Sequence, residues 1–237
     1  MTESIRLAKR LAEQLACSRS EAEQYIQGGW VQVDGVLVQE PGARILPQQQ
    51  LELLPNATLD PVAPVTFLLH KPARVDVEAA LHSISAETLV DNDRSGLRFL
   101  KRHLLNLTIS DRLDTNASGL LVLSQDWQVV RKLVDDAAKV EHEFIVEVDG
   151  ELSADNLALL NHGLSFNNRA LPPCKVSWQN ETRLRFAVKG AVPGQVAVMC
   201  EKVGLEVISV KRLRIGRIPM ASLPVGQWRY LLGYERF

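Results

Sequence analysis

The stretch SDRLDTNASGLLVLSQD (Ser110–Asp126) decides the fold of the larger part of this chain. Its first half is a polar turn that carries Asp114, and its second half is the apolar run Leu120–Leu123. A short apolar run bounded by turn residues predicts a buried strand. An Asp before a polar turn is most often a turn former that bonds its own backbone. Because this carboxylate lies at the mouth of a strand that the core will bury, Asp114 is also a candidate functional group.

On both sides of this strand the chain mixes apolar strands with amphipathic helices, without the regular alternation that gives a parallel sheet. We expect strands at VTFLLHKP (65–72), EFIVEVDG (143–150), RLRFAVKG (183–190) and LEVISVKRLRIGRI (205–218). We expect helices at RFLKRHLL (98–105), DWQVVRKLVDDA (126–137), SADNLALLNHG (153–163) and GQVAVMCEKVG (194–204). Together these elements predict an α+β domain over residues 65–237, with a mixed, mostly antiparallel sheet flanked by helices.

The first 54 residues predict a separate, smaller domain, 1–54. Apolar residues recur at helical spacing over residues 4–16, which predicts an amphipathic helix. Ser18 followed by Glu21 is the capping-box pattern and predicts a second helix directly afterwards. Asp34-Gly35 between apolar positions predicts a β-hairpin. The domain is therefore expected to be a helix-helix-hairpin module.

A polar, Pro-containing segment at residues 55–64 predicts a linker between the two domains. The composition of the 237 residues, with 46% hydrophobic and 23% charged side chains, is that of an ordinary globular protein. No apolar run approaches the roughly 20 residues that a membrane helix needs. The stretch MTESIRLAKRLAEQ (1–14) is charged and has no apolar signal core. We therefore expect a cytoplasmic protein with no membrane partner.

The three cysteines, Cys17, Cys174 and Cys200, lie far apart in the sequence. Neither they nor the five histidines show metal-ligand spacing, and we expect the cysteines to be small core residues. The sequence has no phosphate-binding Gly-rich loop and no heptad repeat. We therefore expect no metal, no small-molecule cofactor and a monomeric chain.

The charge is unevenly distributed although the net charge is only −1. Residues 1–60 carry five basic and eight acidic side chains, whereas residues 202–237 carry seven basic and two acidic ones. The basic C-terminal segment is either an electrostatic footprint for RNA or a solvated strand face. Charge alone leaves both interpretations open.

The first domain resembles the ribosomal-protein S4-like RNA-binding domain. The resemblance covers residues 5–45, and its specific parts are SRSEAEQYI (18–26) and VQVDG (31–35). In that family the two helices present basic side chains to structured RNA, and such phosphate contacts position a protein without reading sequence. The positions that correspond to these side chains are Arg6, Lys9, Arg10 and Arg19.

Nearly the whole chain resembles the bacterial ribosomal RNA pseudouridine synthases of the RsuA/RluB/RluF family. Three stretches carry the resemblance: RLDTNASGLLVLSQD (112–126), HEFIVEV (142–148) and MCEKVGLEVISVKRLRIGRIPMASLPVGQWRYL (199–231). The third follows the large-subunit members of the family closely. The resemblance implies an enzyme that isomerises uridine to pseudouridine in ribosomal RNA and needs no cofactor.

The same resemblance assigns roles to individual residues. Asp114 would be the nucleophile, Phe144 would stack on the flipped uracil, and Arg112 would orient or pair with the carboxylate. Three further basic residues would contact RNA: Lys71, Arg212 and Arg214.

The chain departs from the family pattern at five positions. Phe144 replaces a tyrosine, His142 replaces a lysine, and Asp111 replaces a glycine, which is expected to place a second carboxylate near Asp114. Ala197 and Val198 stand where the family has two arginines, one of which would pair with the catalytic carboxylate. These losses keep an alternative open, a catalytically impaired RNA-binding protein on the same scaffold, and a tRNA-directed pseudouridine synthase is a further alternative.

Overall fold

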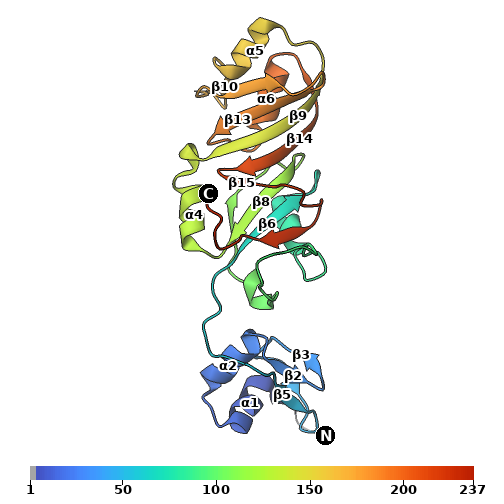
Figure 1. Ribbon diagram of the computed structural model, residues 1–237, viewed down its shortest axis with the longest axis vertical. Coiled ribbons are helices and arrows are strands. Elements are labelled where there is room, and N and C mark those ends of the chain that lie inside the picture. The colour runs from blue at the N-terminus through green and yellow to red at the C-terminus, as the bar shows by residue number, and fades with distance from the viewer. Residues whose placement is uncertain (1–3) are drawn as a thin grey trace. The chain divides into compact units, whose positions relative to one another are not determined.

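The computed structural model describes residues 4–237, which divide into two compact units. The first unit contains the chain up to residue 64 together with residues 98–107. The second unit contains residues 65–97 and 108–237. Figure 1 labels many of the elements of each unit.

The first unit is built from two short helices and small antiparallel sheets. Ser18 and Glu21 form both hydrogen bonds of the expected capping box, and the second helix ends at Gly28. The first helix begins at Leu7 instead of residue 4, because Ile5–Arg6 pair as a strand with Arg44–Ile45. The elements are β1 Ile5–Arg6, α1 Leu7–Leu15, α2 Arg19–Gln27, β2 Val31–Val33, β3 Val36–Leu37, β4 Arg44–Ile45, β5 Leu51–Leu53 and the 3-10 helix η1 Lys101–Leu104.

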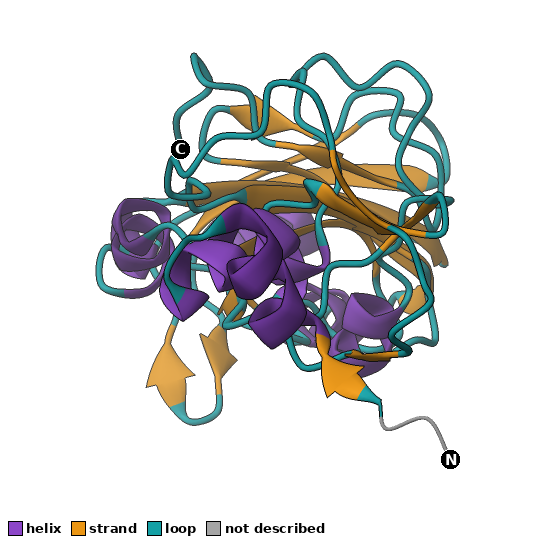
Figure 2. Ribbon diagram, turned by 90° about the horizontal axis from the view of Figure 1, so that it is seen from below, coloured by secondary structure: helices purple, strands orange, loops and turns teal. Residues whose placement is uncertain are grey.

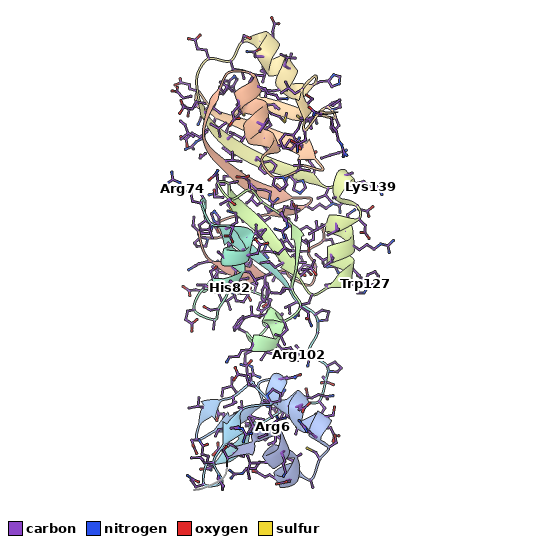
Figure 3. The ribbon with its side chains drawn as sticks, turned by 180° about the vertical axis from the view of Figure 1, so that it is seen from behind. Arg6, Arg74, His82, Arg102, Trp127 and Lys139 are labelled. Carbon is purple, nitrogen blue, oxygen red and sulfur yellow. The ribbon has the colours of Figure 1, made fainter. Side chains whose placement is uncertain are left out.

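Residues 98–107 pack on this unit, although the sequence places them within the larger domain. Arg98 donates a hydrogen bond to the carbonyl of Gly28 at 2.7 Å, and its guanidinium lies 4.8 Å from the centre of the Trp30 ring. Arg102, labelled in Figure 3, donates to the Gln27 side chain at 2.6 Å. The helix expected over 98–105 is reduced to one 3-10 turn, and Asn106 follows it with a positive φ.

The second unit contains a sheet whose main path runs in the order β12-β13-β9-β14-β8-β6-β16, with β7 paired to β8 and β15 to β14. All named strand pairs in it are antiparallel except β8 with β14, as expected for a mixed, mostly antiparallel sheet. Figure 2 shows these strands in orange and the helices in purple. The strands are β6 Thr66–Lys71, β7 Thr108–Asp111, β8 Ser118–Ser124, β9 Glu141–Asp149, β10 Ser165–Phe166, β11 Arg169–Ala170, β12 Lys175–Trp178, β13 Arg183–Lys189, β14 Glu206–Ile215, β15 Ile218–Pro219 and β16 Trp228–Tyr230; β10 and β11 form a separate hairpin. The helices are α3 Val77–His82, α4 Trp127–Val134, the 3-10 helix η2 Ala137–Lys139, α5 Ala154–Asn161 and α6 Gln195–Lys202.

The sheet is anchored by apolar strands that are buried on both faces. Strand β6 is buried along its whole length, and β16 pairs with it. The rings of Phe67, Trp228 and Tyr230 pack within 5.3 Å of one another, centre to centre. Aromatic residues in such an arrangement contribute both buried area and ring-ring attraction. Strand β6, which pairs with β8, is therefore held in a well-packed core.

The parallel pairing of β8 with β14 brings two distant segments of the chain into close contact. Gly119 pairs with Arg212, and a Cβ atom built on Gly119 would lie 2.2 Å from the carbonyl oxygen of Arg212. Gly119 also has φ +116°, a conformation that other residues rarely adopt. The glycine of the Ser-Gly pair is therefore required where β8 and β14 meet, immediately beyond the turn that carries Asp114.

Candidate active site

A cavity of about 320 Å³ opens beside the turn that carries Asp114. Its walls come from that turn, from β9, from α6 and the loop before it, and from the first half of β14. Asp114 and Phe144, which the sequence assigns to catalysis and stacking, both line it. Most of the remaining wall is apolar and includes Val196, Val198 and Ile208. A pocket with a few polar groups in an apolar wall is typical of small-molecule and base-binding sites.

Asp114 is half-buried and its carboxylate is part of a tight turn. Oδ1 accepts a hydrogen bond from the backbone N–H of Asn116 at 2.9 Å, and its carbonyl accepts one from Ala117 at 3.1 Å. Oδ2 faces Gly194, where an added Cβ would lie 3.7 Å away. The carboxylate is thus at once a turn former and a wall of the cavity, so the two interpretations of the sequence do not exclude each other.

The expected pairing of Arg112 with Asp114 is not formed. Arg112 is exposed and donates instead to Glu78 of α3 at 2.8 Å. Among residues 4–237, no Lys, Arg or His nitrogen forms an ion pair with Asp114 within 4.0 Å. The physical reason is that α3, which the sequence analysis missed, places a carboxylate within reach of Arg112.

Lys71 lies close to the same turn but is fully buried. Its ammonium group donates to three backbone carbonyls, those of Pro72 at 2.9 Å, Val75 at 2.6 Å and Thr115 at 3.1 Å. Burial lowers the pKa of Lys71, and the negative charge of Asp114 opposes that shift. The expectation that Lys71 contacts RNA phosphates does not agree with this burial. It lies beside the turn that carries Asp114 and holds that turn through the Thr115 carbonyl.

Arg212 is also buried, with only 1% of its surface exposed, so a direct contact with RNA does not fit this position either. Its guanidinium donates to Asp111 Oδ1 at 3.0 Å and to the carbonyls of Asp111 and Arg112 at 3.1 and 3.3 Å. The second oxygen of Asp111 bonds His142 Nε2. Burial disfavours the charged form of Asp111, but Arg212 and His142 outweigh it and the pKa of Asp111 is lowered. The negative charge of Asp111, which was expected to repel Asp114, is therefore stabilised by two basic partners, Arg212 and His142.

Phe144 lies two residues after His142 on β9, and the side chain is 5% exposed. Its ring contributes to the wall of the cavity, and its centre lies 6.3 Å from that of His142. The stacking role that the resemblance implies for Phe144 stays a prediction.

Helix α6 begins at the cavity and presents two short side chains to it. Ala197 and Val198 are half-buried and both line the cavity. Gln195 is buried and holds the entry to the helix, accepting a hydrogen bond from the Val192 N–H at 3.2 Å. The positions where the resemblance expects arginines are therefore at the cavity, but in this chain they are apolar.

The remaining basic candidates differ in their accessibility. Arg6, labelled in Figure 3, and Lys9 are exposed, and Arg19 is exposed with an ion pair to Glu23 at 3.0 Å. Arg10 is half-buried and donates to the carbonyls of Leu46 and Gln49 at 2.6 and 2.8 Å. Its guanidinium thus stabilises a loop of the first unit, and these two N–H groups are not available to donate to a phosphate.

Arg214 lies two residues after Arg212 on β14, but its ion-pair partners are on β9. It forms ion pairs with Glu141 at 2.7 Å and Glu143 at 3.0 Å, which raise the pKa of Arg214. The charge of Arg214 is thus compensated by two acidic side chains of β9. This compensation could not be recognised in the sequence, because the partners are 71 and 73 residues apart.

Sequence reasoning missed Gly194 as a part of the site. Gly194 precedes α6 with φ +78°, and the same position faces the Asp114 carboxylate. The Pro193-Gly194 pair before a helical pattern is the signal that could have indicated this turn. Within residues 4–237, no cluster of three or more His, Cys, Asp or Glu residues could hold a metal ion, and no helix there is long and apolar enough to span a membrane.

Comparison with known proteins defines the class to which these features point. Residues 5–51 match the S4 domain family. The fold is similar to that of a solved protein described as pseudouridylate synthase, with a TM-score of 0.59, 19% identity and 96% coverage of both chains. The chain therefore combines an S4 domain with a pseudouridine synthase fold.

The similarity in sequence extends over almost the whole chain. The chain is 27% identical over 237 residues to the dual-specificity RNA pseudouridine synthase RluF of Escherichia coli strain K12, which covers 98% of this chain and 77% of that protein. It is also 27% identical over 236 residues to the ribosomal large subunit pseudouridine synthase B of Bacillus subtilis strain 168, covering 97% of this chain and 93% of that protein. These relatives confirm the resemblance inferred from the motifs.

Proposed function

We propose that this chain is an RNA pseudouridine synthase that isomerises uridine to pseudouridine in ribosomal RNA. Its substrate is expected to be the RNA of the large ribosomal subunit. The observation that carries the proposal is that Asp114 and Phe144 line one cavity beside the α6 N-terminus. The names of the relatives support the substrate class.

In this proposal Asp114 attacks the anomeric carbon of the ribose or assists the departure of uracil. Its Oδ1 is held by the Asn116 N–H, so the carboxylate is fixed in orientation before the substrate arrives. The target uridine must leave its stack, which costs a few kcal/mol, and stacking on Phe144 offsets part of this cost. The detached base turns and rejoins the sugar through carbon 5.

The proton on carbon 5 must then be removed without a tyrosine hydroxyl, because residue 144 is Phe. The lining of the cavity contains two carboxylates, Asp114 and Glu201. Glu201 is exposed on α6, and its carboxylate, like that of Asp114, can accept a proton. Water or Glu201 is the proposed acceptor of this proton.

The test is tritium release from carbon-5-labelled uridine in unmodified ribosomal RNA, comparing the wild type with Asp114→Asn. Release by the wild type that falls by at least about 1,000-fold in the variant supports the enzyme and its nucleophile. Unmodified tRNA, labelled in the same way, is the second substrate and tests the tRNA-directed alternative. Absence of release from both RNAs contradicts the proposal for these substrates.

A second candidate function is RNA binding without turnover. It is favoured by the absence of an ion-pair partner for Asp114 among the described residues and by the apolar Ala197 and Val198 at the cavity. Filter binding of the same RNAs distinguishes the candidates, because binding is expected under both and tritium release under the first alone. Binding without release makes this second function the better one.

The remaining proposals concern the setting of the reaction. We infer that the chain acts as a monomer in the cytoplasm and needs no small-molecule cofactor. Exposed Arg6, Lys9 and Arg19 of the S4 domain are the proposed phosphate contacts. Sedimentation of the purified chain at micromolar concentration tests the monomer, since a mass of twice 26.4 kDa would contradict it.

A further inference from the structure

Asp111 connects three elements beneath the cavity. It ends β7, its Oδ1 accepts from Arg212 of β14, and its Oδ2 bonds His142 of β9. All three side chains are almost completely withdrawn from solvent, with 10% of Asp111, 2% of Arg212 and 3% of His142 exposed. A buried carboxylate with a charged partner and a second donor is held in one orientation.

The turn that carries Asp114 is attached to this cluster through its backbone. Arg212 donates to the carbonyls of Asp111 and Arg112, and Arg112 is only two residues from Asp114. A further hydrogen bond runs from Arg212 Nε to the Leu120 carbonyl at 2.8 Å, on the other side of the turn. One guanidinium thus fixes both ends of the segment 112–119.

The orientation of this guanidinium depends on Asp111. Arg212 is fully buried, and Asp111 is the acidic side chain with which it forms an ion pair. Without that carboxylate the buried cation would lack its counter-charge and would draw water or move toward another acceptor. His142 in turn restrains the second oxygen of Asp111, so that the carboxylate cannot rotate away from Arg212.

We propose that Asp111, His142 and Arg212 form a positioning cluster that sets the place of the Asp114 carboxylate from beneath the cavity. This inference rests on the proposed function and adds positioning residues to it. Asp111 itself is not a catalytic residue here, because its two oxygens are occupied by Arg212 and His142. A misplacement of about 1 Å at a reacting group can lower a rate by about 100-fold.

The experiment compares Asp111→Asn with Glu143→Gln, each of which converts a carboxylate to an amide. Glu143 is a matched control, because its side chain is 12% exposed and pairs with two basic partners, Arg185 at 2.8 Å and Arg214 at 3.0 Å. Glu143 lies on β9 next to His142, but its partners, on β13 and β14, belong to an ion-pair network that does not include Asp111. Three readouts are taken on the full chain at 25 °C: amide hydrogen exchange of residues 112–117, tritium release and RNA affinity.

For Asp111→Asn we expect exchange of the Asn116 and Ala117 amides to rise at least about tenfold, kcat to fall by about 100-fold and RNA affinity to stay within about twofold. Glu143→Gln is expected to change none of the three beyond about twofold. Exchange in residues 112–117 that is the same in both variants overturns the proposal. A wild type without tritium release contradicts the proposed function, while the exchange data still decide the positioning.

A second pair of variants covers the case in which Asp111→Asn does not fold. His142→Leu removes the donor to Asp111 and leaves the Arg212 ion pair in place, whereas His142→Gln can still donate. Faster exchange of residues 112–117 in the leucine variant, with wild-type exchange in the glutamine variant, supports the cluster. Equal exchange in the two variants overturns it.

Discussion

Replacing Gly119 by alanine is expected to separate strands β8 and β14, which meet immediately beyond the turn that carries Asp114. An alanine Cβ at this position would lie 2.2 Å from the carbonyl oxygen and 2.6 Å from the backbone nitrogen of Arg212. Both atoms are backbone, so no side chain can rotate away to make room. Strands β8 and β14 would have to move apart by about 1 Å to reach an ordinary van der Waals contact.

The cost has two parts. The φ of +116° places an alanine in an unfavourable backbone region, at about 1–3 kcal/mol. Overpacking at the strand contact adds about 1–3 kcal/mol. The expected loss is therefore about 4 kcal/mol in the free energy of unfolding, or a fall of about 10 °C in Tm for a unit of this size.

Urea unfolding followed by circular dichroism measures this loss, with Gly226→Ala as the matched control. Gly226 has φ +77°, but nothing lies within 4 Å of a Cβ added there, so its variant reports the backbone cost alone. We expect Gly226→Ala to lose about 1–2 kcal/mol. The reasoning about the strand contact is refuted if the two variants lose the same free energy within about 0.5 kcal/mol.

Four other predictions follow from the site and the S4 domain. Ser18→Ala removes the capping box of α2 and should lower the free energy of unfolding by about 1 kcal/mol, measured by urea titration; an unchanged midpoint contradicts the cap's contribution. Val198→Arg places a cation at the cavity that can pair with the Asp114 carboxylate, and it should raise the rate of tritium release by about tenfold. A rate at or below that of the wild type argues that Asp114 needs no cationic partner. Because the pKa of Asp111 is lowered in the folded chain, its negative charge stabilises the fold at pH 7, and this contribution is lost as the pH falls below about 4. The difference in free energy of unfolding between the wild type and Asp111→Asn should therefore narrow between pH 7 and pH 3. A difference that stays constant excludes an electrostatic origin of the stability loss. Replacing both Arg6 and Lys9 by alanine should reduce the slope of log K for RNA against log salt by about 1.5, and an unchanged slope removes these side chains from the RNA contact.

The parts of the fold that could be predicted from the sequence are those with local signals. Helix α2, Arg19–Gln27, begins directly after Ser18 as expected, because the capping-box residues that signal it are adjacent in the chain. The buried strands β6 and β8 are continuous apolar runs, which need no partner to be recognised. Helix α3 was missed, since its six residues carry too short an apolar pattern, and the same holds for the four residues of β7.

The motifs indicated two residues that line the cavity, but not the charge pairing around them. Asp114 and Phe144 lie at one cavity as the motifs indicate. The partners of Arg112 and Arg212 could not be foreseen, because Glu78 and Asp111 are 34 and 101 residues away from them in sequence. Which acidic group neutralises a given arginine is decided by the register of strands and by a short helix, and neither leaves a periodic signal in the sequence.

The docking of residues 98–107 on the S4 unit has a consequence for the chain as a modular object. Three chain passages connect the two units, near residues 64, 97 and 107, so the S4 unit is discontinuous in sequence. A gene fragment that ends at the linker would encode Gly28 and Trp30 without Arg98, their partner in the 237-residue chain. The S4 unit can therefore not be removed by one truncation or transferred by one fusion, because residues 98–107 of it lie within the sequence of the second unit.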